Sequence, residues 1–170
     1  RVLLVEPGYK NKYPPLGLMK LATYHRRRGD FVRFWKGDIR DLVLHVLLDE
    51  ALAAFRKLDS AKKWGKLRPL LSEFVRLRRT KTWEEIKREV GFYSPTVKLW
   101  LDTMCRDYRH ARLPERSRWD RVCITTLFTF HWKLTVNTIR DAKQILNDGG
   151  ELLVGGIAAS VIPDEFESAT

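Results

Sequence analysis

Cysteine, glycine and proline are scarce in this chain of 170 residues, and the scarcity of each excludes a class of protein. The two cysteines, Cys105 and Cys123, are too few to staple a small secreted domain, so we expect a reducing, cytoplasmic setting. Ten glycines and seven prolines, beside 44% apolar residues, exclude a collagen-like repeat and a disordered tail. We therefore expect a folded globular protein.

Long apolar runs and acidic residues are also in short supply. The apolar run at residues 42–48 contains His45 and is followed by Asp49 and Glu50. It falls far below the roughly 20 apolar residues that a transmembrane helix needs, so we expect no membrane-spanning segment. Lysine and arginine outnumber aspartate and glutamate by 32 to 21, which gives a formal charge of +11. This excess favours an anionic partner such as nucleic acid, a phosphate-bearing cofactor or an acidic lipid, without choosing among them.

The first 35 residues show a strand, a helix and a second strand. Residues 2–5 form a short apolar run that is typical of a strand buried on both faces. Apolar residues then recur at helical spacing from Leu18 to His25, and Gly29 is a stop signal for this helix. Residues 31–35 have the pattern of the second strand. Such a unit predicts two parallel strands with the helix packed on one face.

The same pattern returns near the end of the chain. Residues 121–125 are rich in β-forming side chains, residues 133–146 have one apolar helical face, and residues 152–154 form another apolar run. Two strand–helix–strand units are typical of an open, doubly wound, Rossmann-like α/β domain with a parallel sheet. We expect its first strand to lie inside the sheet.

The two halves are separated by 80 residues, 39–118, that contain no convincing strand. Asp38, the Thr82–Glu85 capping-box pattern and the Ser94–Pro95 pair mark three expected helix starts. The segment holds 19 basic and 11 acidic residues, a balance of +8. We therefore expect a Rossmann-like domain at residues 1–38 and 119–170, and a basic helical insertion at residues 39–118.

Ligands of open α/β sheets bind at the carboxyl ends of the strands, which directs attention to the loops that follow them. Gly155 and Gly156 either let a ligand approach the backbone or simply form a tight turn. Thr125, Thr126 and Thr129 are either hydroxyl donors to a ligand or ordinary β-branched strand residues. The residue types alone leave both alternatives open.

Several short motifs in these loops occur together in one family. They are Tyr13-Pro14-Pro15-Leu16-Gly17-Leu18 after the first strand, residues 120–127, and Gly155-Gly156-Ile157-Ala158-Ala159-Ser160. In this order they resemble the cobalamin-binding-type domain at the N-terminus of many radical S-adenosylmethionine enzymes, with Thr125 where a serine is usual. The resemblance covers residues 1–38 and 119–170 and leaves the insertion unexplained.

The resemblance implies a five-stranded Rossmann-like domain that holds cobalamin. It places Thr125, Leu127 and the Gly155-Gly156 turn around the nucleotide tail of the cofactor. The residues that it implies for cofactor binding are Pro14, Pro15, Leu16, Gly17, Thr125, Thr126, Leu127, Thr129, Gly155, Gly156, Ile157 and Ala158.

Two motifs of related proteins are missing from the sequence. None of its four histidines lies in an Asp-x-His-x-x-Gly motif, so cobalamin would be held without a histidine ligand beneath the cobalt. The Cys-x-x-x-Cys-x-x-Cys motif that holds a 4Fe-4S cluster is also missing. We therefore expect the cluster and S-adenosylmethionine in a downstream catalytic domain of the same polypeptide, an oxidoreductase or methyltransferase. The chain from Arg1 to Thr170 would then be a part of this enzyme that is not catalytic alone.

The basic insertion supports an alternative function, a nucleic-acid-binding or protein-interaction module. Arg76, Arg78, Arg79 and Lys81 form its densest local cluster, and Trp83 lies nearby as a possible stacking residue. The simpler interpretation, that these cations cover a solvated helix face, is favoured because lysine and arginine commonly do so.

Overall fold

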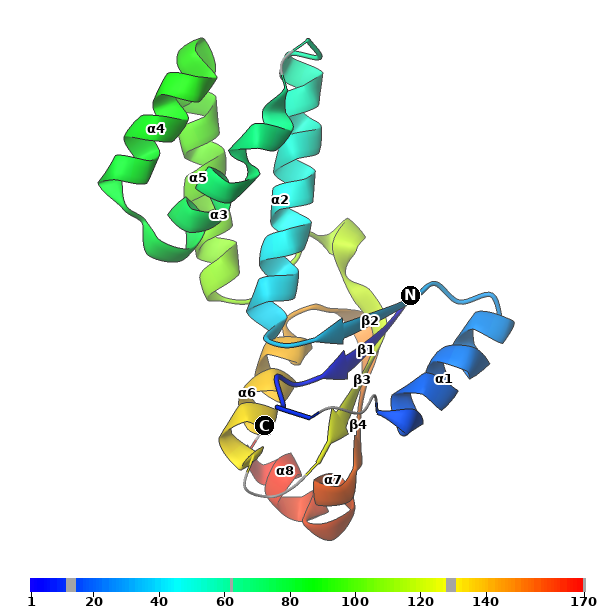
Figure 1. The fold of residues 1–170 in the computed structure, drawn as a ribbon. Coiled ribbons are helices and arrows are strands. Elements are labelled where there is room, and N and C mark those ends of the chain that lie inside the picture. The colour runs from blue at the N-terminus through cyan, green and yellow to red at the C-terminus, as the bar shows by residue number, and fades with distance from the viewer. Residues whose placement is uncertain (12–14, 62, 128–130, 170) are drawn as a thin grey trace. The chain divides into compact units, whose positions relative to one another are not determined.

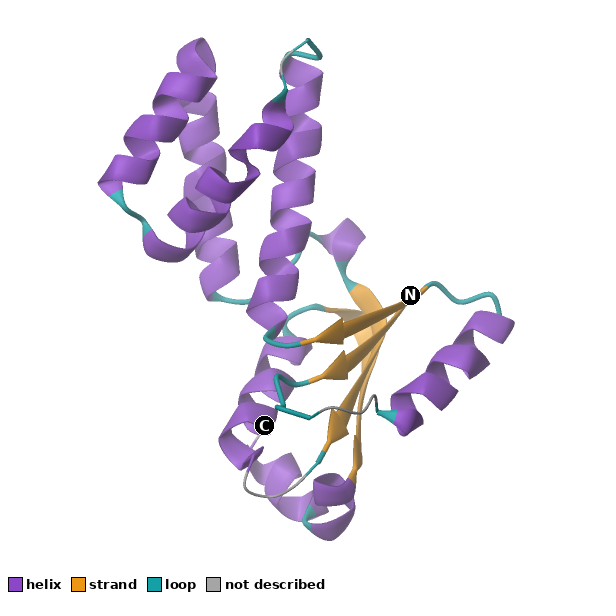
Figure 2. Ribbon diagram, viewed as in Figure 1, coloured by secondary structure: helices purple, strands orange, loops and turns teal. Residues whose placement is uncertain are grey.

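The computed structural model describes residues 1–11, 15–61, 63–127 and 131–169. The chain divides into two compact units, which we treat separately. Arg1–Asp41 and Pro114–Thr170 form the first, the sheet unit, and Leu42–Leu113 form the second, the helical unit. Figure 2 shows that the strands belong to the first unit and that helices dominate the second.

In the part of the sheet unit that the structure describes, four parallel strands lie in the order β2-β1-β3-β4. The strands are β1 (Val2–Glu6), β2 (Val32–Lys36), β3 (Trp119–Thr126) and β4 (Leu146–Gly156). The predicted α/β class with a parallel sheet is confirmed, and β1 lies inside the sheet as expected.

Helices cover both faces of this sheet (Figure 1). All five residues of β1 are buried, because α1 (Leu16–Arg27) lies over one face and α6 (Trp132–Lys143) over the other. Val2 and Leu4 pack with Leu18 of α1 and with Cys123 of β3. Two short helices, α7 (Ile157–Val161) and α8 (Pro163–Ala169), follow β4. The ring of Phe166 in α8 packs against Trp132 of α6, with 4.6 Å between the ring centroids.

The start of β4 differs from the prediction. The expected helix over residues 133–146 ends at Lys143, and Leu146 already begins the strand. Leu146 pairs with Trp119, but the next pair joins Arg121 to Glu151, so a bulge on β4 accommodates the additional residues. Gly149 allows this irregularity with a φ of +74°. The Gly149-Gly150 pair thus lies inside a strand and does not terminate a helix.

The described residues of the helical unit form four main helices: α2 (Ile39–Leu58, which begins in the sheet unit), α3 (Arg68–Leu77), α4 (Thr80–Val90) and α5 (Ser94–Arg109). Short 3-10 turns lie at Trp64–Leu67 and Gly91–Tyr93, and a third at Glu115–Ser117 belongs to the sheet unit. The rings of Trp64 and Trp100 each lie 5.2 Å from Phe55, and these aromatic contacts form one part of the unit's core.

Only one of the three predicted helix caps is present. The Asp38 carboxylate accepts a hydrogen bond of 2.8 Å from the Arg40 N–H at the start of α2. Thr82 is buried inside α4, because the N-cap of this helix is Arg79, three residues before the expected cap. Ser94 is the first residue of α5 and makes no capping bond. The preceding 3-10 turn brings the chain into helical geometry before Ser94, so no serine cap is used.

Among the described residues, no helix has the combination of length and apolar character that crossing a membrane requires.

The cap of α2 gives a matched stability test. We expect Asp38→Ala to lower the free energy of unfolding by about 1 kcal/mol, because an N–H group of the first turn loses its acceptor. Ser94→Ala is the control and should change stability by less than about 0.5 kcal/mol, because this hydroxyl makes no capping bond. Urea unfolding followed by circular dichroism measures both; equal losses would show that Asp38 does not act as a cap.

Candidate functional site

A cavity of about 740 Å³ lies in the sheet unit, at the carboxyl ends of β3 and β4. Three segments distant in the sequence line it: the start of α1, the end of β3, and the turn from β4 into α7. Because β3 and β4 are parallel neighbours, Thr125 is paired with Gly155 and their loops leave the sheet together.

The cavity brings together nine of the twelve predicted cofactor-binding residues: Pro15, Leu16, Gly17, Thr125, Thr126, Leu127, Gly155, Gly156 and Ile157. Ala158 is buried beside it and does not line it. Pro14 and Thr129 lie outside the described residues. The placement supports one common site for the three loops, while the cofactor itself stays a prediction.

The cavity is also lined by seven residues that sequence reasoning missed: Asn11, Leu18, Leu21, Cys123, Ile124, Leu153 and Val154. Two of these residues could have been found from the sequence, because side chains two positions apart in a strand point to the same face of the sheet. Cys123 lies two positions before Thr125, and Leu153 lies two positions before Gly155. Leu21 follows Leu18 at helical spacing on α1.

The two adjacent glycines have different roles. A Cβ atom on Gly156 would lie 2.2 Å from the Thr126 carbonyl oxygen, and its φ is +110°. The backbone of β3 therefore requires glycine here, whether or not a ligand binds. A Cβ atom on Gly155 would meet nothing within 4 Å, and this residue lines the cavity. A tight turn therefore explains the glycine at position 156. The glycine at position 155 instead leaves space in the cavity that a ligand could occupy.

The two neighbouring threonines, Thr125 and Thr126, also have different roles. Thr126 is buried, and its Oγ1 accepts a hydrogen bond of 3.0 Å from the Ala159 N–H. The Ala158 N–H donates to the Leu127 carbonyl at 3.1 Å, so both contacts hold the start of α7 against the end of β3. Thr125 is half-buried and lines the cavity. Thr126 thus has a structural role, and Thr125 is the better candidate for contact with a ligand.

The lining is mainly apolar and contains no charged side chain among the described residues. Leu16, Leu153 and Ile157 are exposed to 71%, 48% and 54%, although they border this cavity. Burial raises the pKa of the Cys123 thiol above its ordinary value, which keeps it protonated and weakly nucleophilic. These residues can bind an apolar group, but they offer no acid, base or activated nucleophile.

The start of α1 adds a polar feature to this lining. Pro15 precedes the helix in an extended conformation and provides no side-chain cap. The first helical bond runs from the Met19 N–H to the Pro15 carbonyl, so the N–H groups of residues 16–18 come before the regular bonding pattern. Such a helix start carries partial positive charge and favours phosphate or another anion.

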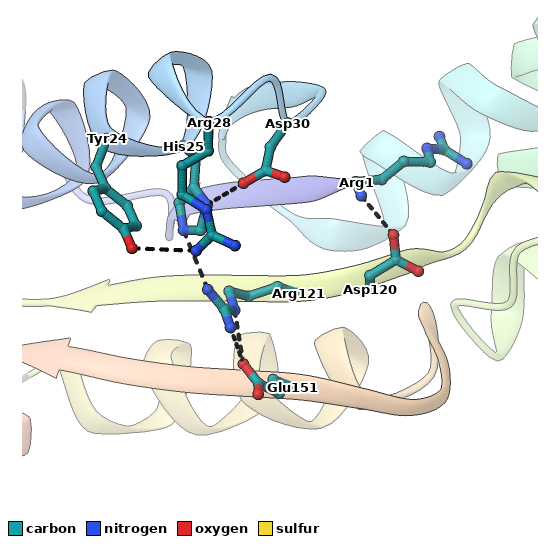
Figure 3. A network of polar contacts seen from close by, with 8 residues as sticks. All are labelled: Arg1, Tyr24, His25, Arg28, Asp30, Asp120, Arg121 and Glu151. Carbon is teal, nitrogen blue, oxygen red and sulfur yellow. Dashed lines mark hydrogen bonds and ion pairs between the residues drawn. The ribbon is translucent and has the colours of Figure 1, made fainter.

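A polar network lies at the other end of α1 (Figure 3). The buried ring of His25 contacts Asp30 through Nδ1 at 2.7 Å and Arg121 through Nε2 at 3.4 Å. Arginine only donates, so Nε2 accepts and the proton of a neutral imidazole is on Nδ1, where it is donated to Asp30. Arg121 also binds Glu151 of β4 at 2.7 Å. The network links α1, β3 and β4, and we assign it a structural role.

Other polar residues of the sheet unit take part in packing. Glu6, the last residue of β1, is 1% exposed and pairs with Lys36 Nζ at 3.4 Å. The His131 ring packs against Tyr9 with 4.8 Å between centroids. Within the described ranges, no three histidine, cysteine or acidic side chains cluster in a way that could hold a metal ion.

The predicted basic cluster is partly engaged within the helical unit. Arg79 pairs with Glu73 at 3.3 Å, and Arg78 interacts with the Cys105 thiol. The half-buried Trp83 ring packs against Phe74 and lies 5.8 Å from the Lys98 ammonium. These contacts favour the interpretation of a packed and solvated helix face.

Comparison with known proteins adds no assignment: no family model matches the chain, and no match to a curated protein or a solved structure was found.

The glycine pair gives a sharp test of this geometry. We expect Gly156→Ala to lower the free energy of unfolding by at least about 2 kcal/mol, since its φ and the Thr126 backbone both oppose a Cβ atom. Gly155→Ala, the matched control, should be neutral or stabilising by up to about 1 kcal/mol, because alanine restricts the unfolded chain. Urea unfolding distinguishes them, and similar effects would refute the close approach.

The network of Figure 3 predicts a pH dependence. The hydrogen bond from His25, followed by the charge of Arg28, holds the pKa of Asp30 below its ordinary value. Its stabilising contribution is therefore present above the unfolded pKa, about 3.9, and is lost as the pH falls through the lower folded pKa. Asp30→Asn should destabilise the protein at pH 6, and its difference from the wild type should shrink below pH 4. Carboxyl NMR titration gives the pKa directly; an ordinary or raised value would contradict the contact.

Proposed function

We propose that the sheet unit is a cobalamin-type cofactor-binding module that serves a radical S-adenosylmethionine enzyme, whose catalytic domain lies elsewhere in the same polypeptide. The observation that carries this proposal is the single cavity lined by the three segments on which the family resemblance rests. The fold agrees with it, since open parallel sheets bind ligands at this edge.

The residues present fit the nucleotide tail of cobalamin. A volume of about 740 Å³ lies within the usual range of small-molecule pockets. The uncharged, leucine-rich lining suits a neutral aromatic base, and the start of α1 suits the phosphate that follows it. A complete cobalamin is larger than this cavity, so only part of the cofactor fits inside.

The chain's own residues have a binding role in this proposal. Pro15, Leu16 and Gly17 border the tail from α1, and Thr125 offers a hydroxyl from β3. Gly155 keeps the space open, while Gly156 and Thr126 fix the wall. The bound cofactor would supply methyl transfer to a substrate radical, a chemistry that belongs to the cofactor. The protein orients the cofactor and excludes water from its apolar part.

We also propose the cytoplasm as the location of the protein. Cys105 and Cys123 are buried free thiols, which agrees with a reducing compartment.

Ligand titration tests the cofactor proposal. The probes are hydroxocobalamin, followed by its visible spectrum and equilibrium dialysis, and the dimethylbenzimidazole ribonucleotide that forms its tail. We expect the wild-type chain to bind both, with weak binding of hydroxocobalamin because the downstream catalytic domain of the proposed enzyme would normally complete the site. Gly155→Leu should weaken binding by at least about tenfold, because overfilling a packed site costs roughly 1–3 kcal/mol.

Met19→Gln is the control, since Met19 is exposed on α1 and does not line the cavity. It should bind as the wild type does. Undiminished binding by Gly155→Leu would place the cofactor elsewhere, and absence of binding of either probe to the wild type would refute the proposed function.

A further inference from the structure

Three helices of the helical unit, α3, α4 and α5, pack into one group (Figure 1). α3 contacts both α4 and α5, and α4 also contacts α5. Each helix buries apolar residues, among them Leu71 and Phe74 from α3, Ile86 and Val90 from α4, and Val97 and Leu101 from α5. This packing fixes α4 and α5 relative to each other. Neither the family resemblance nor the proposed cofactor uses the three-helix group.

The connection between α4 and α5 is short and contains a glycine. α4 ends at Val90, and the 3-10 turn Gly91–Tyr93 leads directly into α5 at Ser94. Gly91 has a φ of +58°, which favours glycine, and its N–H donates to the Lys87 carbonyl at the end of α4. Two packed helices joined by a three-residue turn with a glycine form a helix-turn-helix motif.

The second helix of this motif, α5, has one exposed stripe. Its residues Thr96, Leu99, Thr103 and Arg106 are spaced by three, four and three positions, which places them along one side of the helix. All four are exposed, and the exposed fraction of Leu99 is 68%. At a rise of about 1.5 Å per residue, the stripe is about 15 Å long. The major groove of B-form DNA, which is about 12 Å wide, admits such a helix.

The stripe contains groups that can contact base edges. The methyl groups of Leu99 and of the two threonines suit the thymine methyl group, and the threonine hydroxyls can donate or accept hydrogen bonds. Arg106 has donors for guanine; its side chain is 65% exposed, and its contact with Asp107, at 3.7 Å, is longer than a hydrogen bond. Asp102, an acidic residue beside the stripe, accepts bonds of 2.6 and 2.7 Å from Lys98, which offsets its charge.

The charge of the three-helix group suits a polyanion. Residues 68–109 contain 10 basic and 6 acidic residues, a balance of +4. Lys81 and Arg88 are exposed on α4, and the first helix of the motif is the one that crosses the phosphate backbone in DNA-binding proteins. The basic cluster at residues 76–81 is partly engaged in contacts within the unit, so the stripe on α5, and not this cluster, carries the inference.

We propose that α4 and α5 form a DNA-binding helix-turn-helix, in which the stripe of α5 faces the base edges in the major groove of double-stranded DNA. Duplex RNA fits this helix poorly, because its major groove is deep and too narrow for side chains to read. One motif covers only a short half-site, so we expect a dissociation constant of about 1–100 μM for DNA of random sequence. This function is independent of the cofactor proposed for the sheet unit.

The test uses the full chain and three labelled probes at one salt concentration. They are a short DNA duplex of random sequence, an RNA duplex of the same length, and single-stranded DNA of the same length. Fluorescence anisotropy gives the affinities, sequencing of the DNA that the protein retains gives the preferred half-site, and NMR of backbone amides gives the location. We expect the DNA duplex to bind at least about tenfold more tightly than the RNA duplex, and the amide signals of residues 94–106 to shift.

Variants separate this surface from general attraction by positive charge. Arg106→Gln should weaken binding of the preferred duplex at least about tenfold and relax the preference at one base pair, as the loss of one base contact does. Arg56→Gln, the matched control, removes one exposed arginine from α2, outside the three-helix group, and should change the affinity by less than about twofold. Leu99→Glu should abolish binding, because it places a negative charge against the DNA. Circular dichroism checks the fold of this variant, which we expect to be retained because Leu99 is exposed.

The proposal fails if the folded wild type binds no duplex DNA, if it binds duplex RNA equally well, or if it binds single-stranded DNA more tightly. It also fails if Arg106→Gln and Arg56→Gln lose affinity equally, because that result shows attraction by charge alone. Undiminished binding by Leu99→Glu would place the DNA on another surface. Losses confined to Arg106→Gln and Leu99→Glu, together with amide shifts along α5, would support the proposed surface.

Discussion

The close approach of Gly156 to Thr126 determines the geometry at the ligand edge of the sheet. A backbone contact that excludes even a Cβ atom fixes the end of β4 against the end of β3. The Ala158 and Ala159 amides then bond to Leu127 and Thr126, so α7 begins at a defined place. Gly155, next to this contact, leaves open space at the cavity. A fixed wall and an open position beside it are what a pre-formed binding site requires.

Each unit has a cavity, and the two cavities differ in the chemistry of the residues that line them. The sheet unit offers an uncharged, leucine-rich lining with backbone amides, and the helical unit offers arginine, histidine and serine beside leucine, from α2 and α3. The excess of positive charge in the sequence favours an anionic partner, and this partner stays a prediction. The row of Arg68, Ser72 and Arg76 that lines this second cavity is visible as spacing in the sequence, yet its partner His45 is 23 residues away from Arg68 and comes from another helix.

The sequence predicted the parallel sheet, the inside position of its first strand and three loops that border one cavity, because short apolar runs and turn residues are local signals. It did not resolve the roles of Gly155 and Gly156, since the difference depends on the carbonyl of Thr126, a residue 30 positions away from Gly156. It misplaced the start of β4 because Ile145 and Leu146 continue the apolar helical spacing, while pairing with Trp119 draws Leu146 into the strand. The capping motif at Thr82 failed for a similar reason, because burial of that residue within α4 outweighs its preference for a cap.

The bulge near the start of β4 makes the pairing at the amino end of this strand independent of the pairing at its carboxyl end. Between Leu146 and Glu151 the strand gains residues relative to β3, whereas from Glu151 to Gly156 the pairing with β3 continues without a shift. A change in chain length near Gly149 would therefore be absorbed at the amino end of the sheet and would not displace the residues around Gly155. Relatives of this protein can accumulate insertions and deletions there during evolution while the cavity keeps its shape.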